Sequence, residues 1–525
     1  MINRMEQLQK AREDAEPFDV IVIGGGATGL GCAFDASSRG YRTLLLEQSD
    51  FAKGTSSRST KLIHGGVRYL KQGQVSLVFH ALRERKRLLK NAPHLVSTRS
   101  FIIPSTRWWE KFYYGLGLKL YDLMGHSDDF ARSEWLSTTC VRNALPTLQA
   151  NPLYGGNRYY DGQFDDARLA INLMQSIYEQ GGIALNYAKV TSFIKENGRI
   201  QGVYALDCES GETFPIHAGV VINATGVFTD RIRQMDDPGH KPVIRPSQGV
   251  HIVLERSFFP GDSALLVPKT ADGRVLFAIP WYNRVLIGTT DSPVETPVLE
   301  PTALEEEIEF LLDHAGRYLT RAPSRSDIKS IFTGLRPLVS RGKSKKTQHI
   351  SRNHTLLTDP SGLITITGGK WTTYRKMAEE TIDRAIRVGK LPPQKCKTAD
   401  LPIHGWCHSP ADDPHYRFYG SDEKFVRALA GSRQGWTEPL HPHLTCRPCD
   451  VAWAARNEMA RTVDDVLSRR SRSLLLDVNA ALNITPIVAT ILAEELGHGR
   501  SWIQQQIEEF QEIAGHYQPN RNEKR

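Results

Sequence analysis

The chain has 525 residues, with 66 lysine and arginine residues against 58 aspartate and glutamate residues, which gives a formal net charge of +8. Hydrophobic residues make up 40% and charged residues 24%, a balance that excludes a wholly disordered chain. At about 150 residues per domain, the length predicts roughly three domains. The basic surplus indicates an anionic partner, and nucleic acid, a membrane surface and an anionic substrate all satisfy it.

The N-terminal 17 residues are polar and carry several acids, so we expect neither a signal peptide nor a mitochondrial transit peptide. The most apolar window, residues 20–36, is interrupted by glycines, which is typical of a strand–turn–helix rather than of a spanning helix. Seven cysteines provide no disulfide framework, which favours a reducing cytoplasm. Cys446 and Cys449 have CxxC spacing without a second ligand pair, so we treat them as ordinary thiols and predict no metal site.

The first elements in chain order resemble a nucleotide-binding unit. An apolar, β-branched strand is predicted over residues 18–23, a helix up to residue 39, and a second strand over residues 41–46. Glu47 ends the second strand, where an acid accepts hydrogen bonds from a ribose 2′-hydroxyl and repels the 2′-phosphate of NADP. This order predicts a dinucleotide site and leaves NAD and FAD open, while a phosphate-free turn is the structural alternative.

The turn after the first strand carries the pattern G-x-G-x-x-G at Gly24, Gly26 and Gly29. Gly24 permits the tight turn, Gly26 lets the backbone approach a pyrophosphate, and Gly29 lets the helix pack closely on the strand. The N-terminus of the helix adds free N–H groups and a positive dipole. The turn is therefore the predicted phosphate site.

Residues 55–69 combine hydroxyl groups and two glycines with four cations, namely Arg58, Lys61, His64 and Arg68. Such a loop can wrap a polar cofactor and leave a cation facing a substrate, whereas a solvated basic loop is the alternative. Apolar residues are interleaved with the polar ones, so we expect some of these side chains to face inward.

Several segments in order resemble the FAD-dependent, quinone-linked glycerol-3-phosphate dehydrogenase family. The first two are G-G-G-A-T-G and T-S-S-R-S-T-K-L-I-H-G-G-V-R-Y-L in the regions just described. The later ones are V-I-N-A-T-G at 221–226, P-W-Y-N-R-V-L-I-G-T-T-D at 280–291, T-G-L-R-P-L at 333–338 and T-G-G-K-W-T-T-Y-R-K at 367–376. The resemblance is dense over residues 18–390, and N-E-M-A-R-T-V-D-D-V-L-S-R-R at 457–470 is similar to that family's helical cap.

The resemblance implies an α/β fold, with a Rossmann-like FAD-binding domain, an inserted α+β substrate domain and a C-terminal all-helical domain. Predicted strands over 219–224 and 363–367 also end at glycines, so three glycine-marked strand ends predict one cofactor held by a doubly wound sheet. The expected parts are FAD-binding at 18–85, 161–245 and 331–390, a substrate- or membrane-facing insertion at 86–160, a substrate-domain sheet at 246–330, and a helical domain at 395–518.

FAD is the implied cofactor, and the matched motifs supply its expected contacts. The helix predicted from about Thr372 would point its N-terminus at the flavin, where it stabilises the negative charge of the reduced ring. The cofactor-binding residues carried over are Gly24, Gly26, Thr28, Gly29, Glu47, Thr55, Ser56, Ser57, Lys61, Leu62, His64, Ala224, Thr225, Gly226, Gly369, Lys370, Trp371 and Thr372.

The implied reaction takes a hydride from carbon 2 of glycerol 3-phosphate to the flavin and yields dihydroxyacetone phosphate. The phosphate requires cations, the alcohol proton requires a base, and the reduced flavin requires positive charge. His251 is our first choice for the base and His64 the second, although a structural histidine is the alternative for His251. The implied catalytic residues are His251, His64, Arg336 and Lys370, and the implied substrate-binding residues are Arg68, Tyr69, Arg336, Arg352 and Lys370.

Residues 107–124 contain six aromatic residues, several leucines and three cations, a composition typical of a membrane-interface element. A buried helix in the substrate domain is the alternative. The basic cluster Arg341, Lys343, Lys345 and Lys346 would attract anionic lipid or form a solvated loop. The resemblance to a quinone-linked family, together with these segments, implies a cytoplasmic protein attached peripherally to the cytoplasmic membrane, with a membrane quinone and an anionic lipid surface as partners; a homodimer is compatible with the sequence.

The C-terminal region follows a proline-bearing link at 391–402. Helical spacing predicts helices over 451–469, 486–496 with Thr485 as N-cap, and 502–514 after Ser501, and this region shows no chemistry of its own. The main function predicted is quinone-linked dehydrogenation. The alternatives are an oxidase of the same family that uses oxygen, another flavoprotein of the amino-acid oxidase superfamily, and a basic, cofactor-holding nucleic-acid module; no recognition motif supports the last, so we expect no nucleic-acid partner.

Overall fold

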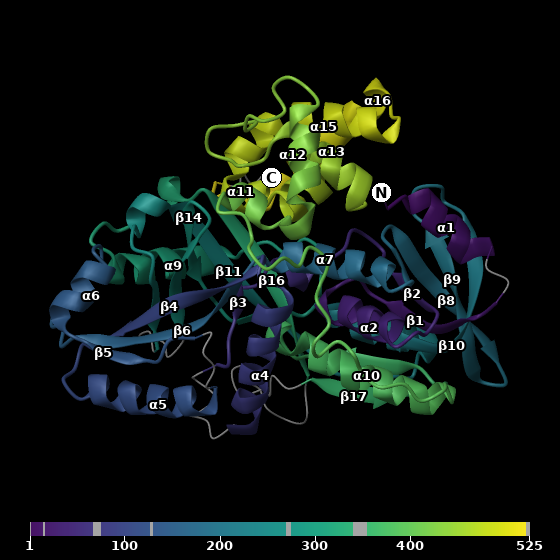
Figure 1. The fold of residues 1–525 in the computed structure, drawn as a ribbon, viewed down its shortest axis with the longest axis horizontal. Helices are drawn as coiled ribbons and strands as arrows, with labels where there is room; N and C mark the ends of the chain where they lie inside the picture. Colours follow the sequence, from purple (N-terminus) through teal and green to yellow (C-terminus); the bar gives the residue numbers. More distant parts are fainter. Residues whose placement is uncertain are drawn as a thin grey trace.

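The computed structural model describes residues 2–13, 16–66, 75–125, 130–268, 275–339 and 354–520. Two β-sheets lie side by side, and a group of C-terminal helices lies across one edge of both (Figure 1). The architecture is a mixed α/β FAD-binding fold with a C-terminal helical domain, which confirms the predicted fold class. No helix in the described ranges is long and apolar enough to cross a membrane.

The first sheet is the nucleotide-binding sheet, and its central strands β1, β2, β10 and β18 are parallel. Its strand order is β17 (Thr355–Thr358), β18 (Ile364–Thr367), β10 (Thr213–Asn223), β1 (Phe18–Ile23), β2 (Thr43–Leu46) and β7 (Ile183–Leu185). In addition, β9 (Arg199–Asp207) pairs with β10, and β8 (Ala188–Glu196) pairs with β9. Val20 and Val22 face one hydrophobic core, and Ile21 and Ile23 face another, as expected for a strand buried on both sides.

Helices cover both faces of this sheet. α2 (Ala27–Ser38) lies between α7 (Asp166–Glu179) and α10 (Tyr374–Gly389) on one face. On the other face, α1 (Arg4–Glu13) contacts β7 and β10, and α8 (Thr229–Asp236) contacts β8, β10 and β18. The expected helix after the glycine turn is therefore present and ends at Ser38, close to the predicted end. Its near-continuous burial explains why it reads as apolar in the sequence.

The second sheet is mostly antiparallel and supports the other side of the site. Its strands are β15 (Ser292–Pro293), β11 (Ile244–Glu255), β14 (Arg284–Gly288), β13 (Leu276–Trp281), β12 (Ala264–Val267), β4 (Val96–Pro104), β6 (Gly156–Phe164) and β3 (Leu62–Ile63), with β16 (Ser330–Val339) on β11 and β5 (Glu134–Leu136) on β6. The helices around it are α4 (Val75–Asn91), α5 (Glu110–Met124), α6 (Thr138–Ala144) and α9 (Glu305–Tyr318).

Strand β16 departs from the expected division of the chain. Residues 331–390 are expected in the FAD-binding domain, whereas β16 pairs with β11 at ten consecutive positions, from Ile244 opposite Val339 to Val253 opposite Ser330. This long antiparallel register commits β16 to the second sheet, and the chain returns to the first sheet at β17. The motif T-G-L-R-P-L therefore belongs to the second sheet.

The C-terminal domain consists of short and long helices around a common core. Its elements are α11 (Pro414–Arg417), α12 (Glu423–Gly431), α13 (Pro448–Asn457), a π-helical turn (Asp465–Arg470), α14 (Ser473–Leu476), α15 (Val478–Leu496) and α16 (Arg500–Gly515). The predicted helix 451–469 is wrong, because α13 ends at Asn457 and the π-helical turn is separate. Cys446 and Cys449 are buried in this core, and burial raises the pKa of both thiols.

The predicted helix start at Pro486 is also wrong. α15 begins eight residues earlier, where the Asp477 carboxylate caps it by accepting a hydrogen bond from the N–H of Ala480 at 3.1 Å. Pro486 lies inside α15, although an interior proline normally disfavours a helix. α16 likewise begins at Arg500 after Gly499 rather than after Ser501.

Candidate active site

A cavity of about 490 Å³ lies where the two sheets meet, at the carboxyl ends of β1, β10 and β18. Loops from the first sheet line one side, and β11 and β16 of the second sheet line the other. The carboxyl ends of parallel strands are where α/β folds bind dinucleotides. Of the described residues carried over from the sequence, all except Gly29, Ser57 and Lys61 line this cavity.

The turn between β1 and α2 has no room for larger residues. Gly24 has φ of +107°, and a Cβ there would lie 2.8 Å from the carbonyl oxygen of Ala224. A Cβ on Gly29 would collide with Gly24, and one on Gly26 would lie 3.0 Å from Ser56 Oγ. Ser56 also accepts a hydrogen bond from the N–H of Ala27 at 2.9 Å. Gly24 therefore makes the tight turn and Gly29 the close packing that the sequence predicts, and the approach of Gly26 to a pyrophosphate stays a prediction.

Glu47 lines the cavity at the end of β2, as predicted. Its Oε2 accepts a hydrogen bond from the N–H of Gly25 at 2.6 Å, and its Oε1 accepts one from Ser49 at 2.9 Å. Burial raises the pKa of Glu47. The acid therefore holds the glycine turn in shape in addition to facing the expected position of a ribose.

The ends of β10 and β18 complete the cradle. Gly226 and Gly369 have φ of +58° and +77°, and a Cβ on Gly369 would lie 2.7 Å from the terminal methyl carbon of Met377. The indole N–H of Trp371 donates to the carbonyl oxygen of Ser56 at 2.9 Å, which links the β18 end to the loop after β2. An elongated cradle closed by backbone at three strand ends fits a bound FAD.

The four predicted catalytic residues, His64, His251, Arg336 and Lys370, all line this cavity. The Arg336 guanidinium is held by Gln248 O at 3.2 Å, Thr290 O at 3.0 Å, Thr289 Oγ1 at 3.1 Å and Asp291 Oδ1 at 3.3 Å. Gly249 makes room for it, since a Cβ there would lie 2.7 Å from Arg336 Cζ. A cation fixed in this way can receive an anion without reorganising.

His251 lies on β11 between two neighbouring strands. Its ring stacks on Phe332 of β16 at 4.7 Å between centroids, with 9° between the planes, and it leans over Gly288 of β14. Its Nε2 is 3.0 Å from Thr60 Oγ1, and its Nδ1 is buried without a hydrogen-bond partner among the described residues. Burial, followed by the charges of Lys61 and Arg336, holds the pKa of His251 well below its ordinary value. The imidazole is therefore neutral at pH 7 and able to accept a proton.

Two residues carried over as cofactor contacts point elsewhere. Ser57 does not line the cavity, and the Lys61 side chain is fully buried, with Nζ 2.7 Å from Asp166 Oδ2 and 2.7 Å from Ser57 O. Burial lowers the pKa of Lys61 to about 7. The inward orientation expected for this loop is correct, but the Lys61 cation meets an aspartate rather than a cofactor.

Several predicted residues lie outside the described ranges. They are Arg68, Tyr69, Arg352, Arg341, Lys343, Lys345 and Lys346. The structure also adds cavity residues that the sequence analysis missed, namely Lys53, Thr60, Lys189 and Arg231. Thr60 stood inside a recognised motif, whereas Lys189 and Arg231 reach the cavity only because β8 and α8 fold back toward it, so no local pattern marks them.

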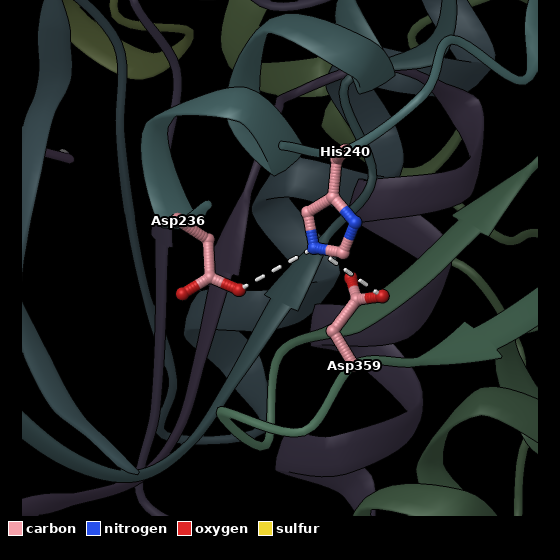
Figure 2. Close-up of side chains that lie close together, drawn as sticks. All are labelled: Asp236, His240 and Asp359. Carbon is pink, nitrogen blue, oxygen red and sulfur yellow. Dashed lines mark ion pairs between the residues drawn. The ribbon is translucent and has the colours of Figure 1, made fainter. Parts of the chain in front are cut away.

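Asp236, His240 and Asp359 form a separate cluster near the end of α8 (Figure 2). Asp236 pairs with Lys195 at 2.7 Å, and Asp359 pairs with Arg233 at 2.8 Å, so each carboxylate already faces a cation. Arg233 lies 3.2 Å from His240 Nδ1, and because arginine only donates, Nδ1 must accept. A neutral ring then carries its proton on Nε2, which faces both carboxylates. This cluster is an ion-pair network in which both carboxylates already pair with cations.

Comparison with known families agrees with the cavity. A family model described as FAD dependent oxidoreductase matches residues 19–375, and a model for the C-terminal domain of alpha-glycerophosphate oxidase matches residues 364–503. The fold and the cradle together therefore define an FAD-dependent oxidoreductase, and FAD is confirmed as the cofactor.

Relatives that match along nearly the whole chain indicate which kind of FAD-dependent oxidoreductase this is. A mitochondrial glycerol-3-phosphate dehydrogenase of Arabidopsis thaliana is 40% identical over 97% of this chain and 87% of its own length, and that of Homo sapiens is 38% identical over 96% and 74%. A glycerol-3-phosphate dehydrogenase structure from Bacillus halodurans, complexed with FAD, has a TM-score of 0.81 at 28% identity and covers 99% of this chain and 98% of its own. The chain belongs to the FAD-dependent glycerol-3-phosphate dehydrogenase family.

Proposed function

We propose that the protein oxidises sn-glycerol 3-phosphate to dihydroxyacetone phosphate and passes the electrons to a membrane quinone. The observation that carries the proposal is that His251, Arg336 and Lys370 line the same cavity as the glycine turn that would hold FAD. The relatives' names supply the substrate, and the side chains supply the three chemical functions that this substrate requires.

Bound FAD would supply the acceptor for a hydride, that is, two electrons and one proton, from carbon 2. The hydroxyl proton at carbon 2 leaves at the same time, and we assign the neutral His251 imidazole to accept it. The substrate thereby loses two electrons and two protons and becomes a ketone. The low pKa of His251 belongs to the free enzyme. A substrate dianion beside Arg336 offsets one of the cations that depress it, which strengthens the base when substrate is bound.

Arg336 is the proposed phosphate ligand, because its guanidinium is planar and already oriented by four oxygen atoms. Lys370 follows the glycine pair after β18 and lines the cavity, where a point charge stabilises the reduced ring. His64 lines the same cavity and remains our second choice for the base. The cofactor residues named from the sequence that line the cavity are proposed in these roles.

The direct test is anaerobic reduction of the purified flavoprotein by glycerol 3-phosphate, which is monitored as the loss of flavin absorbance. We expect bleaching with glycerol 3-phosphate and none with glycerol, which lacks the phosphate. Arg336→Ala should retain FAD while raising KM and lowering turnover. Equal bleaching by glycerol, or normal kinetics in Arg336→Ala, would remove the phosphate site from this cavity.

Helix α5 supports the quinone and the lipid surface as partners. It lies along the edge of the molecule opposite the C-terminal helices (Figure 1) and buries only Gly115, Leu118 and Tyr121. The alternative of a buried helix therefore holds only for one side of α5, since most large side chains of this region face solvent. The exposed ones are Trp108, Trp109, Phe112, Tyr113, Leu116, Leu120, Leu123 and Trp135.

This exposed set, which we call the α5 face, has the composition of a membrane-interface surface. Leu116 and Leu123 are 75% and 77% exposed, so a soluble monomer gains nothing from them. A bilayer that covers the α5 face would bring a lipid-borne quinone to the enzyme. We propose peripheral attachment to the cytoplasmic membrane on this basis.

Vesicle flotation tests the attachment. The wild type should float with phosphatidylglycerol vesicles at low salt, and the double variant Leu116→Gln/Leu123→Gln should remain in the soluble fraction with unchanged anaerobic bleaching. Phe425→Gln is the matched control, because Phe425 is 53% exposed on α12 in the C-terminal domain. Flotation of the double variant at the wild-type level would contradict attachment through the α5 face.

Oxygen is the second candidate acceptor, since the model that matches residues 364–503 is named for an oxidase. Oxygen consumption and quinone-analogue reduction, measured in the same preparation, distinguish the two. Rapid reoxidation by oxygen, with no quinone reduction in vesicles, would favour the oxidase.

A further inference from the structure

The hydroxyl of Thr60 is the polar group that contacts the His251 ring. Thr60 lines the cavity, and its Oγ1 lies 3.0 Å from Nε2, while Nδ1 has no hydrogen-bond partner among the described residues. Phe332 stacks on the ring and Gly288 lies beneath it, but neither distinguishes a nitrogen from a carbon. If the ring flipped by 180°, a carbon would replace Nε2 beside the hydroxyl. Thr60 therefore selects one orientation of the imidazole.

A buried carboxylate fixes both chain neighbours of Thr60. Asp166 is fully buried at the start of α7. Its Oδ2 accepts hydrogen bonds from the N–H of Ser59 at 3.0 Å, from Ser59 Oγ at 2.7 Å and from Lys61 Nζ at 2.7 Å. With Ser59 and Lys61 both attached to one carboxylate, the Thr60 backbone between them has little freedom to move.

The C-terminal domain reaches the same carboxylate through Arg472. This arginine is fully buried, and its NH2 group donates to Asp166 Oδ1 at 2.9 Å and to Ser57 O at 2.8 Å. Its φ of +63° places it in the left-handed region, just before α14. The domain in which the sequence showed no chemistry thus holds the loop that touches the proposed base.

We propose that Thr60 is a positioning residue for His251, and that Asp166 and Arg472 position Thr60. Thr60 fixes the orientation of the His251 imidazole, and the C-terminal domain makes that arrangement rigid. This inference rests on His251 as the base in the proposed function.

The first test compares Thr60→Val, which keeps the shape and removes the hydroxyl, with Thr60→Ser, which keeps the hydroxyl. In anaerobic single-turnover reduction by glycerol 3-phosphate, Thr60→Val should be slower by about tenfold to 100-fold, because a misplaced base costs about that much. Its FAD content and its substrate concentration for half-maximal rate should stay within about twofold of the wild type. Thr60→Ser should recover most of the rate, and a Thr60→Val rate equal to the wild type would overturn the proposal.

The second test uses the C-terminal domain. Arg472→Gln should slow flavin reduction, and the double variant with Thr60→Val should be no slower than the slower single variant, because both act through one orientation. Arg461→Gln is the control, since that arginine belongs to the same domain and pairs with the partly exposed Glu209. Fully multiplicative losses in the double variant would show that Arg472 does not act through Thr60.

A readout without turnover separates this inference from the proposed function. Nitrogen NMR of holoenzyme with ¹⁵N-labelled histidine reports the ring tautomer, and the missing signals of His251→Asn assign it. Thr60→Val and Arg472→Gln should change the His251 signals, whereas Arg461→Gln should not. Unchanged signals refute the positioning role even if glycerol 3-phosphate is the substrate, and a failure of the wild type to bleach refutes the function alone.

Discussion

Gly288→Ala provides a sharp test of His251, because the substitution adds one methyl group beside the ring. A Cβ on Gly288 would lie 2.8 Å from His251 Nε2 and 2.9 Å from Cγ, and closer still to Cδ2. Carbon contacts are favourable at about 3.5–4.0 Å, so the ring must shift by about 1 Å. The ring cannot shift freely, because it is stacked on Phe332 and hydrogen-bonded to Thr60.

A displacement of about 1 Å at a catalytic group costs about 100-fold in rate, which corresponds to about 2.7 kcal/mol at the transition state. We expect this loss in kcat/KM of Gly288→Ala, measured by anaerobic flavin bleaching with glycerol 3-phosphate. FAD content should not change, because Gly288 lies outside the cofactor cradle.

Gly431→Ala is the matched control, since a Cβ at that position meets nothing within 4 Å. It should behave as the wild type in both rate and FAD content. A Gly288→Ala enzyme with kcat/KM within threefold of the wild type would refute the reasoning, because the packed imidazole would then have no role in catalysis.

Three further outcomes are expected. Gly24→Ala should be purified without FAD and show no flavin absorbance, since φ of +107° and a carbonyl 2.8 Å from the new Cβ both oppose it. Glu458→Gln should lower the free energy of unfolding in urea by about 3–5 kcal/mol, because it leaves the buried Arg168 charge unpaired; a loss below 1 kcal/mol would contradict this. The pKa of His251 is lowered, so its base form persists below pH 6.5 and kcat/KM should decline only beneath that pH; a decline centred above pH 6.5 would exclude His251 as the base.

The cofactor half of the site was predictable because its signals are local. A tight turn, a close backbone approach and a helix N-terminus each depend on residues adjacent in the chain, so Gly24, Gly26 and Glu47 could be assigned roles from spacing alone. The ends of β10 and β18 were located for the same reason, since each is an apolar run that stops at a glycine.

The environment of the proposed base was not predictable, because it depends on strand register. His251 lies opposite Gly288 on one side and opposite Phe332 on the other, and these partners are 37 and 81 positions away in the chain. Neither residue type has a chemical signal of its own. The same holds for Pro486, whose place inside α15 is decided by the cap at Asp477 and by packing rather than by local preference.

The positive charge of the chain also has a different meaning in the folded protein. Several cations of the loop after β2 meet acids rather than a ligand: Lys53 pairs with Asp464 at 2.7 Å, Arg58 with Glu300 at 2.6 Å and Lys61 with Asp166 at 2.7 Å. Two of these partners, Asp464 and Asp166, also contact arginines of the C-terminal domain.

These ion pairs join the loop after β2 and the start of α7 to the C-terminal domain in a largely buried region. Arg469 and Arg470 both pair with Asp50, and the three side chains are almost completely buried. Buried charges are screened far less by salt than exposed ones. The buried ion pairs between the loop after β2 and the C-terminal domain should therefore persist at high ionic strength. Attachment of the α5 face to anionic lipid should instead weaken with salt, to the extent that electrostatic attraction contributes to its binding free energy. The dependence on salt concentration thus distinguishes the cations that stabilise the fold from those that bind a partner, a distinction that net charge alone does not provide.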